Sequence, residues 1–282
     1  MRKKKWGWKL VRFSLIALYL MFIILPLLWM VGMSLKSYAE QYTQDITLFP
    51  IDPSWSNYVR IWDAIPLARY LKNSLVISIC TMVVCLAVSI FAAYAMSKFR
   101  FRGRTFFSTA ALFTQLMPGI LFILPIYTVF VRIQQTTGIR LVGSYLGIVI
   151  TYSTFGIPFS IWMMRSYFDT IPSDLAQAAM IDGCTRMQAF FRIILPLSLP
   201  GLAATGMYVF TLSWNEVLFA TVLTNSETRT FSIGLREFEG QNTTDLGLIM
   251  AASVVVTVPV VALFMSFQRF IVSGLTGGGV KE

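Results

Sequence analysis

The chain has few charged side chains for its length. Its 282 residues include 23 Lys and Arg and 13 Asp and Glu, so charged residues make up 13% of the sequence, whereas a soluble domain carries about 25%. A soluble fold of this size needs more polar surface than these residues supply. Intrinsic disorder is also excluded, because a chain with 56% hydrophobic residues buries itself in an apolar environment.

Histidine is absent from the sequence. This excludes Ser-His-Asp and Cys-His nucleophile systems, imidazole proton relays and most metal sites. Cys80, Cys85 and Cys184 show no Cys-x-x-Cys spacing, so we expect small buried hydrophobic residues and no disulfide framework. No Gly-x-x-x-x-Gly-Lys-Ser/Thr sequence occurs. We therefore expect a chain that is not an enzyme and binds no nucleotide, metal or other cofactor itself.

Long apolar runs are abundant, and the mean hydropathy is +0.69. A helix needs about 20 mostly apolar residues to cross a bilayer core about 30 Å thick, whereas transmembrane strands alternate in polarity over about ten residues. The runs are long and unbroken, and the first exceeds the apolar region of about 7 to 15 residues of a signal peptide, so it reads as a retained anchor. We predict an all-α, polytopic membrane protein forming one domain over residues 1–282, with six spans at residues 10–34, 71–97, 106–131, 143–164, 197–224 and 249–272.

The distribution of Lys and Arg predicts the orientation. Taking alternate connections as one side of the membrane, the side with both termini holds 15 of the basic residues and the other side holds 8. Acidic residues are distributed the other way, 4 against 8. Because basic residues are enriched in cytoplasmic connections, both termini are expected in the cytoplasm. The net charge of +10 thus reflects membrane orientation and not nucleic-acid binding.

Two outer connections have features of their own. Tyr58, Ile61, Trp62 and Ile65 recur at helical spacing, which predicts a short helix at the membrane interface with its aromatic side chains at headgroup level. The other connection, residues 225–247, is polar and long enough to reach away from the membrane.

The inner connection at residues 171–196 contains helix signals. Ser173 or Asp174 is suited to cap a first helix, and Gly183 is suited to the left-handed conformation that ends it. Local chemistry therefore predicts a helix, a glycine turn and a second helix. A plain solvated connection is the alternative.

The second helix of this connection has its own start and stop signals. Thr185 and Gln188 have the spacing of a capping box, and Pro196 is expected to end the helix. Asp182 opposes the dipole of the first helix, so we expect it to find a partner at the start of the second helix or in Arg186.

The connection resembles the Glu-Ala-Ala…Gly motif of permease subunits of binding-protein-dependent ABC importers. The likeness extends along the chain and is strongest with the carbohydrate branch, in its maltose-type second permease subunits. Gln177 replaces the usual Glu, and Cys184 replaces the usual Ala. The segments that carry the resemblance are Gln177–Gly183, Phe191–Leu197, Asn73–Leu75, Ala92–Ala95, Phe101–Arg104, Ile157–Phe159, Met164–Phe168, Trp214–Glu216 and Gly274–Lys281.

The resemblance implies a type I ABC importer permease in a prokaryotic cell membrane. It implies that the chain forms half of a sugar path that works by alternating access, with a second homologous permease, two cytoplasmic ATPase subunits that bind ATP and Mg, and an extracytoplasmic sugar-binding protein as partners. The loop at Gly240, Gln241 and Asn242 would contact the binding protein, and the tail from Gly274 would run toward the ATPases. The residues implied to couple the 174–192 hairpin to the ATPase are Gln177, Ala178, Ala179, Asp182, Gly183 and Arg192.

Glu216 is the one carboxylate well inside a predicted span, and an ionisable residue inside a membrane indicates a functional site. Trp214 and Asn215 precede it, and an aromatic ring with amide and carboxylate oxygens suits a polyhydroxylated ligand. These three residues are candidates for lining the substrate path. The alternative is that Glu216 pairs with a basic residue of a partner helix and that Trp214 only packs.

Small residues gather at the start of the fifth span, at Gly201, Ala203, Ala204 and Gly206. They predict a close-packing face against the second permease, with a lipid-facing surface or a simple kink as alternatives. A secondary transporter or channel is the alternative function. Such a protein usually has ion-coupling residues within the bundle, and this chain has a single carboxylate there.

Overall fold

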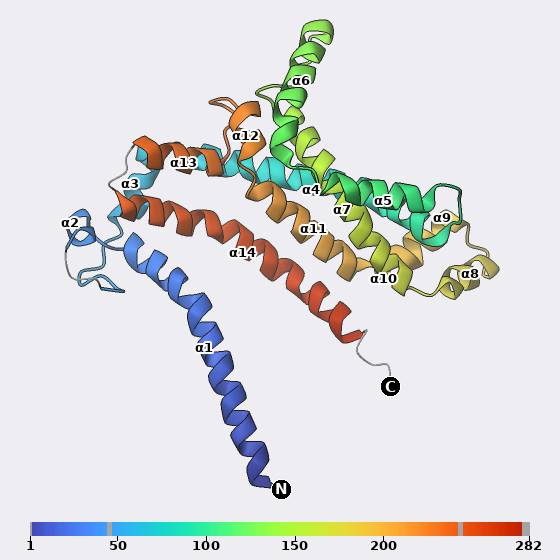
Figure 1. The fold of residues 1–282 in the computed structure, drawn as a ribbon, viewed down its shortest axis with the longest axis horizontal. Helices are drawn as coiled ribbons and strands as arrows, with labels where there is room; N and C mark the ends of the chain where they lie inside the picture. The colour runs from blue at the N-terminus through green and yellow to red at the C-terminus, as the bar shows by residue number, and fades with distance from the viewer. Residues whose placement is uncertain (1, 44–46, 242–244, 278–282) are drawn as a thin grey trace. The chain divides into compact units, whose positions relative to one another are not determined.

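The computed structural model describes residues 2–43, 47–241 and 245–277. Within these ranges all regular secondary structure is helical (Figure 1), so the predicted all-α class is confirmed. The elements are α1 (Arg2–Ser34), α2 (Tyr38–Gln41), α3 (Ser56–Ala64), α4 (Leu67–Lys98), α5 (Arg104–Thr114), the 3₁₀ turn η1 (Gly119–Phe122), α6 (Ile123–Thr137), α7 (Tyr145–Thr170), α8 (Ser173–Ile181), α9 (Arg186–Ala189), the π-helix η2 (Phe190–Ile194), α10 (Leu195–Leu197), α11 (Leu199–Trp214), α12 (Leu218–Leu223), α13 (Phe231–Gln241) and α14 (Leu246–Gly277).

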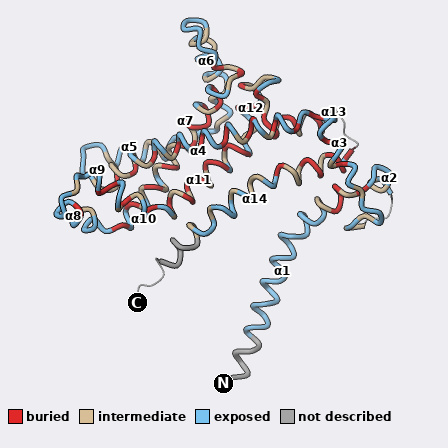
Figure 2. The backbone as a smooth tube through the Cα atoms, turned by 180° about the vertical axis from the view of Figure 1, so that it is seen from behind, coloured by how far each residue is buried: buried red, intermediate tan, exposed pale blue. Residues whose placement is uncertain are grey.

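The chain forms two compact units. The first comprises residues 1–68 and 234–258, and the second comprises residues 69–233 and 259–282. In the first unit the apolar helix α1 is exposed over residues 8–29, as the pale blue tube in Figure 2 shows. An exposed apolar helix of this length is suited to lipid or to another subunit.

The predicted interfacial helix exists as α3, and its buried residue Asn57 organises the first unit. The Asn57 Nδ2 donates to the carbonyl oxygens of Ser34 at 2.9 Å and Lys36 at 2.8 Å, which satisfies backbone acceptors where α1 ends. One turn further along α3, Arg60 pairs with Asp245 at 3.2 Å. Asn57 therefore fixes α3 to the end of α1, and Arg60 fixes it to the residue directly before α14.

The second unit is built on close packing of α4, α7 and α11. A Cβ atom at Gly156 of α7 would lie 2.9 Å from the Cys85 sulfur and 3.7 Å from Val209, so only glycine allows these three helices to approach. The small residues of α11 serve the same contact, since Gly201, Ala203 and Gly206 are buried within the chain. The prediction that this face packs against a second permease is therefore wrong for these three residues, while Ala204 is half-buried.

Two apolar clusters lie at opposite ends of α4 and α7 within the second unit. One surrounds Tyr152 and includes Phe219 and Leu223 of α12. The other surrounds Phe168 and includes Phe190 and Ile194 of the segment that follows the glycine turn. The α8–α9 region is thus rooted in a hydrophobic core.

Among the described residues, five helical segments are long and apolar enough to cross a bilayer. A sixth is present if Arg186–Leu197 and Leu199–Trp214, whose axes differ by 72°, count as one broken span. This agrees with a polytopic membrane protein. The five segments are Trp8–Ser34, Leu67–Lys98, Gly119–Thr137, Tyr145–Thr170 and Leu246–Ile271.

Two of the predicted spans are not continuous helices. Residues 106–131 are divided between α5, η1 and α6, because Pro118 has no N–H and disfavours helical geometry in the residue before it. Residues 197–224 are divided between α11 and α12. No proline or glycine marks that second break, so hydropathy and local propensity both predicted a single helix there.

Candidate functional site

The α8–α9 hairpin is held by backbone bonds at its glycine turn. Gly183 has φ +90°, and its N–H donates to the Met180 carbonyl at 3.2 Å, while the Cys184 N–H donates to the Ala179 carbonyl at 2.9 Å. This pair of bonds is a Schellman motif, in which a left-handed residue closes the helix end. The predicted role of Gly183 in the turn is confirmed.

The two helix starts of the hairpin differ. Thr185 forms the predicted capping box with Gln188, with bonds of 3.3 Å and 2.8 Å. In contrast, α8 begins after Pro172 without a side-chain cap, so capping by Ser173 or Asp174 is wrong. The fixed φ of Pro172 explains the helix start at this position. Asp174 in the first turn interacts favourably with the positive end of the helix dipole and stabilises α8.

The second helix continues past Pro196, where it was expected to end. Residues 190–194 form a π-helix, in which the Leu195 N–H donates to the Phe190 carbonyl. The wider π turn accommodates Pro196, which has no N–H. The chain bends two residues later at Ser198, which is fully buried and whose N–H donates to the Ile194 carbonyl at 3.1 Å.

The inward face of the hairpin packs against the rest of the second unit. Ala179 and Ala189 are buried, and the Phe190 ring lies 4.5 Å from Tyr94 and 6.3 Å from Phe168, measured between centroids. The small alanine side chains let the two short helices lie close to the ends of α4 and α7. Of the residues implied to couple, Ala179 therefore faces the core and not a partner.

The outward face and tip of the hairpin are exposed. Ile181, the last residue of α8, is 86% exposed, and Met187 on α9 is 57% exposed. The candidate coupling residues Gln177, Ala178, Asp182, Gly183 and Arg192 are all exposed. Asp182 is the C-cap of α8. The hairpin thus exposes more than one large apolar side chain, and exposed apolar surface marks an interaction site where it is contiguous.

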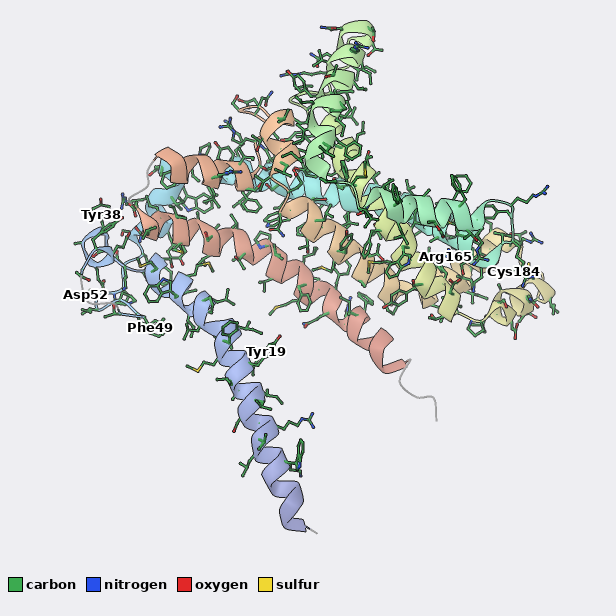
Figure 3. All side chains as sticks on the ribbon, viewed as in Figure 1. Tyr19, Tyr38, Phe49, Asp52, Arg165 and Cys184 are labelled. Carbon is green, nitrogen blue, oxygen red and sulfur yellow. The ribbon has the colours of Figure 1, made fainter. Side chains whose placement is uncertain are left out.

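A set of polar contacts, here called the hairpin clasp, ties the end of α7, directly before the hairpin, to α4 and α5. The Ser97 hydroxyl donates to Asp169 Oδ1 at 2.6 Å, and Arg165 Nε lies 3.6 Å from Asp169 Oδ2. Arg165 also donates to the Ser108 hydroxyl of α5. The Lys98 ammonium donates to the Ile171 carbonyl at 2.6 Å. Figure 3 labels Arg165 of the hairpin clasp and Cys184, which follows the glycine turn.

The break between α11 and α12 contains Trp214 and Glu216. The Trp214 ring is 3% exposed, and it packs against Phe210 at 5.3 Å and Phe231 at 4.7 Å. The Glu216 carboxylate accepts hydrogen bonds from the Phe219 N–H at 2.9 Å and the Ala220 N–H at 3.1 Å. It therefore satisfies N–H groups that the start of α12 leaves free.

These contacts change the reading of the three candidates. Glu216 lies in a helix break and not inside a continuous span, and Trp214 packs within the chain, as the alternative reading of that ring proposed. Asn215 is the exposed member of the three. Its Nδ2 donates to the Thr211 carbonyl at 3.0 Å, and its side chain borders a hollow of about 530 Å³.

The predicted polar loop at residues 225–247 is mostly a turn followed by α13. Asn225 Oδ1 accepts from the N–H groups of Glu227 at 2.9 Å and Thr228 at 3.0 Å, which shapes the turn before the helix begins at Phe231. Gly240 and Gln241 belong to the end of α13, so a loop at these positions is wrong. Asn242 lies outside the described residues.

Comparison with known proteins identifies the architecture. Residues 85–277, which include the hairpin, α11 and α12, match the family model described as "Binding-protein-dependent transport system inner membrane component". The chain belongs to this family. The expected multi-pass inner-membrane component is thus confirmed, and such a component is the non-catalytic transmembrane part of the transport system. The family membership favours this function over a secondary transporter or channel.

Individual relatives agree along almost the whole permease. It is 35% identical over 269 residues to the inner membrane ABC transporter permease protein YcjP of Escherichia coli, with 94% of each chain covered. It is 33% identical to the trehalose transport system permease protein SugB of Mycobacterium tuberculosis, with 92% of this chain and 93% of that one covered.

A solved structure supports the fold. A chain of a bacterial ABC transporter involved in the import of the acidic polysaccharide alginate superposes with a TM-score of 0.77 at 23% identity, covering 93% of the permease and 95% of that chain. The type I importer permease fold is thereby confirmed.

Several residues that position this site were not found from the sequence. Asp169 and Ser97 of the hairpin clasp are 72 residues apart, and no local pattern connects them. Asn73, which holds the segment after α12 through two bonds of 2.8 Å, appeared only within a segment of resemblance. Tyr208 and Thr211, which share the hollow with Asn215, gave a weak signal as polar positions on one helical face.

Proposed function

We propose that this chain is the permease subunit of an ATP-driven sugar importer, forming one half of the substrate path. The observation that carries the proposal is the rigid hairpin at residues 173–197, which is rooted in a hydrophobic core and exposes an apolar tip. The name of SugB, a trehalose permease, supports a sugar as the transported class.

The hairpin is proposed to dock into a cleft on a cytoplasmic ATPase. Ile181 would fill the centre of the contact, with Gln177, Ala178, Asp182 and Arg192 around it, while Ala179 and Gly183 keep the hairpin in shape. ATP and Mg would be bound by that ATPase and not by this chain. Both termini and the hairpin would then lie in the cytoplasm, as the distribution of basic residues predicts.

Movement of the hairpin would reach the membrane helices through the two kinds of contact at its root. The aromatic contacts of Phe190 with Tyr94 and Phe168 resist separation, and the hairpin clasp ties the end of α7, from which the hairpin starts, to α4 and α5. A displacement of the ATPase cleft would therefore move these helices together, which is the step that alternating access requires.

The remaining partners are proposed from membership of the family of binding-protein-dependent transport components. The apolar face of α1 suits lipid or a second, homologous permease, and a second copy of the ATPase would serve that permease. An extracytoplasmic sugar-binding protein would contact the segment at Gly240, Gln241 and Asn242. Asn215 would border the sugar path, with Trp214 and Glu216 supporting its wall from behind.

Gly183 allows a direct test. In Gly183→Val, a β-branched residue at φ +90° would cost about 1–3 kcal/mol in backbone strain and distort the docking surface. We expect the transporter purified in mild detergent to lose its ATPase subunit, and ATP-driven uptake of radiolabelled trehalose to fall at least tenfold.

Two variants control for strain itself. Asn tolerates the left-handed region, so Gly183→Asn should retain the ATPase. Gly138 also has a positive φ of +75° and open space around it, so Gly138→Val places equal strain away from the hairpin and should retain the ATPase too. If the wild-type chain retains no ATPase, or Gly183→Val keeps it, the proposed coupling role is wrong.

A further inference from the structure

The helix α11 presents two faces of opposite character. Phe210, Ser213 and Trp214 point into the second unit and are buried. Tyr208, Thr211 and Asn215, at spacings of three and four residues, share the other face and border the hollow of about 530 Å³. The open side of α11 therefore carries Tyr208, Thr211 and Asn215, whereas Trp214 lies on the buried side.

The open face contains unused hydrogen-bonding groups. Thr211 and Asn215 are exposed, and the amide of Asn215 uses one N–H to reach the Thr211 carbonyl. Its oxygen and second N–H make no further hydrogen bond to the residues that the structure describes. Hydrocarbon cannot satisfy such groups, so a polar occupant is favoured at Thr211 and Asn215, while the rest of the lining is mostly apolar.

The residues around the hollow carry no charge. Its other lining residues are Met207, Leu212, Phe264 and Ile271, so among the side chains that the structure describes no Asp, Glu, Lys or Arg contributes to it. A hollow without a countercharge does not favour an ionised ligand. The hollow is wide and open, so it is suited to a transient contact rather than to an enclosed binding pocket.

Aromatic rings continue the same face onto α7. The ring of Phe159 lies 4.4 Å from that of Tyr208 and 5.5 Å from that of Trp162, measured between centroids. Trp162 is 46% exposed. Aromatic rings provide rigid apolar surface, against which the C–H faces of a sugar ring can stack while its hydroxyl groups bond to amide and hydroxyl side chains.

We propose that Tyr208, Thr211 and Asn215 form a contact site for an uncharged, hydroxyl-rich sugar on its way through the membrane. Asn215 and Thr211 exchange hydrogen bonds with the sugar hydroxyls, and Tyr208 supplies a ring face. This inference rests on the proposed function, because the sugar reaches the site only in an assembled importer. It excludes Trp214 and the Glu216 carboxylate as direct contacts, since both are used within the chain.

Thiol labelling tests whether the face is open to water. In a background without the native cysteines, Thr211→Cys and Asn215→Cys would be compared with Ser213→Cys, on the buried face of the same helix and 3% exposed. The probe is a charged, membrane-impermeant methanethiosulfonate, applied to the assembled transporter in liposomes from both sides. We expect residues 211 and 215 to react at least ten times faster than residue 213.

Equal, slow labelling at all three positions would overturn the inference, because lipid or the second permease would then cover the face. Labelling that is fast and is slowed several-fold by trehalose in the presence of the binding protein supports it. Fast labelling that no neutral sugar slows would also count against a sugar contact.

Uptake kinetics provide the second measurement. With radiolabelled trehalose and maltose as probes, Asn215→Ala and Thr211→Val should raise the apparent KM about tenfold, the loss expected for one hydrogen bond to a substrate. Thr154→Val is the matched control, an exposed threonine on α7 whose hydroxyl bonds to its own helix. Its apparent KM should remain unchanged.

The two failures are distinguishable. A wild-type transporter that takes up no neutral sugar contradicts the proposed function and this inference with it. A wild-type transporter that takes up trehalose or maltose, with unchanged KM in Asn215→Ala and slow labelling at residues 211 and 215, contradicts the inference alone.

Discussion

The α8–α9 hairpin and the α11–α12 break are both interruptions in helical chain, but they are held differently. The hairpin is closed by bonds between residues three to five apart, at Gly183 and Thr185. At the break, Glu216 caps α12 locally, but the segment that follows α12 is held by residues far away in sequence. Asn73 bonds to the carbonyls of Glu227 and Arg229, and the Ser74 hydroxyl accepts from the Phe231 N–H at 2.9 Å.

Because of this difference, the hairpin can move as a unit, whereas the segment after α12 is fixed in place. A locally closed hairpin keeps its shape when it shifts relative to the membrane helices, because no distant bond has to break inside it. The segment after α12 is fixed to α4, and a displacement there would break several buried hydrogen bonds at once. We therefore expect mutations to damage stability mainly at the break and coupling mainly at the hairpin.

The largest effect on stability is expected from Asn73→Ala. This change leaves two carbonyl acceptors without donors and removes the acceptor of the Tyr145 hydroxyl, which lies at 2.6 Å. The free energy of unfolding should fall by about 3 kcal/mol, measured by thermal or detergent-induced unfolding of the purified transporter. The exposed neighbour Lys72 provides the control, and a midpoint equal to that of Lys72→Ala would show that α12 is not held from α4.

A smaller effect is expected at Glu216. Glu216→Ala removes the acceptors of two N–H groups of α12 and should cost about 1–2 kcal/mol, whereas Glu216→Gln keeps one oxygen and should cost about half of that. The same unfolding measurement checks the order of the two variants. Neither should change the apparent KM for sugar more than about twofold; a tenfold rise in Glu216→Gln with unchanged stability would return the carboxylate to the substrate path.

The smallest effect is expected at the capping box. Thr185→Ala removes one cap and should cost about 1 kcal/mol, confined to the amides of residues 186–189. Hydrogen exchange of these amides should become faster, with no change in the unfolding midpoint of the whole transporter. Thr170→Ala, which removes a threonine at the end of α7 that caps no helix start, should leave exchange in α9 unchanged. A loss of global stability in Thr185→Ala would mean that the hairpin is not a separate local unit.

The same difference explains what the sequence predicted. The turn at Gly183 and the capping box at Thr185 depend on neighbours along the chain, so their residue types and spacing were sufficient. The break before α12 was missed, because Val217, Leu218 and Phe219 continue the apolar pattern. Glu216, whose carboxylate caps the start of α12, was interpreted as an isolated charge within a span. Which side of α11 is open depends on Phe231 covering Trp214, a contact that only the folded chain supplies.

Because residues 190–194 form a π-helix, the direction in which the hairpin points depends on the exact number of residues in this segment. Each of its turns takes one residue more than an α-helix would, so deleting a single residue there would return the segment to the α register. Everything before the deletion would then be turned by about 100° relative to α11. The exposed Ile181 side chain would face away from the proposed ATPase cleft although every residue of the tip was intact. Related permeases that keep the tip but lose one residue in this segment would need a differently placed cleft on their motor subunit.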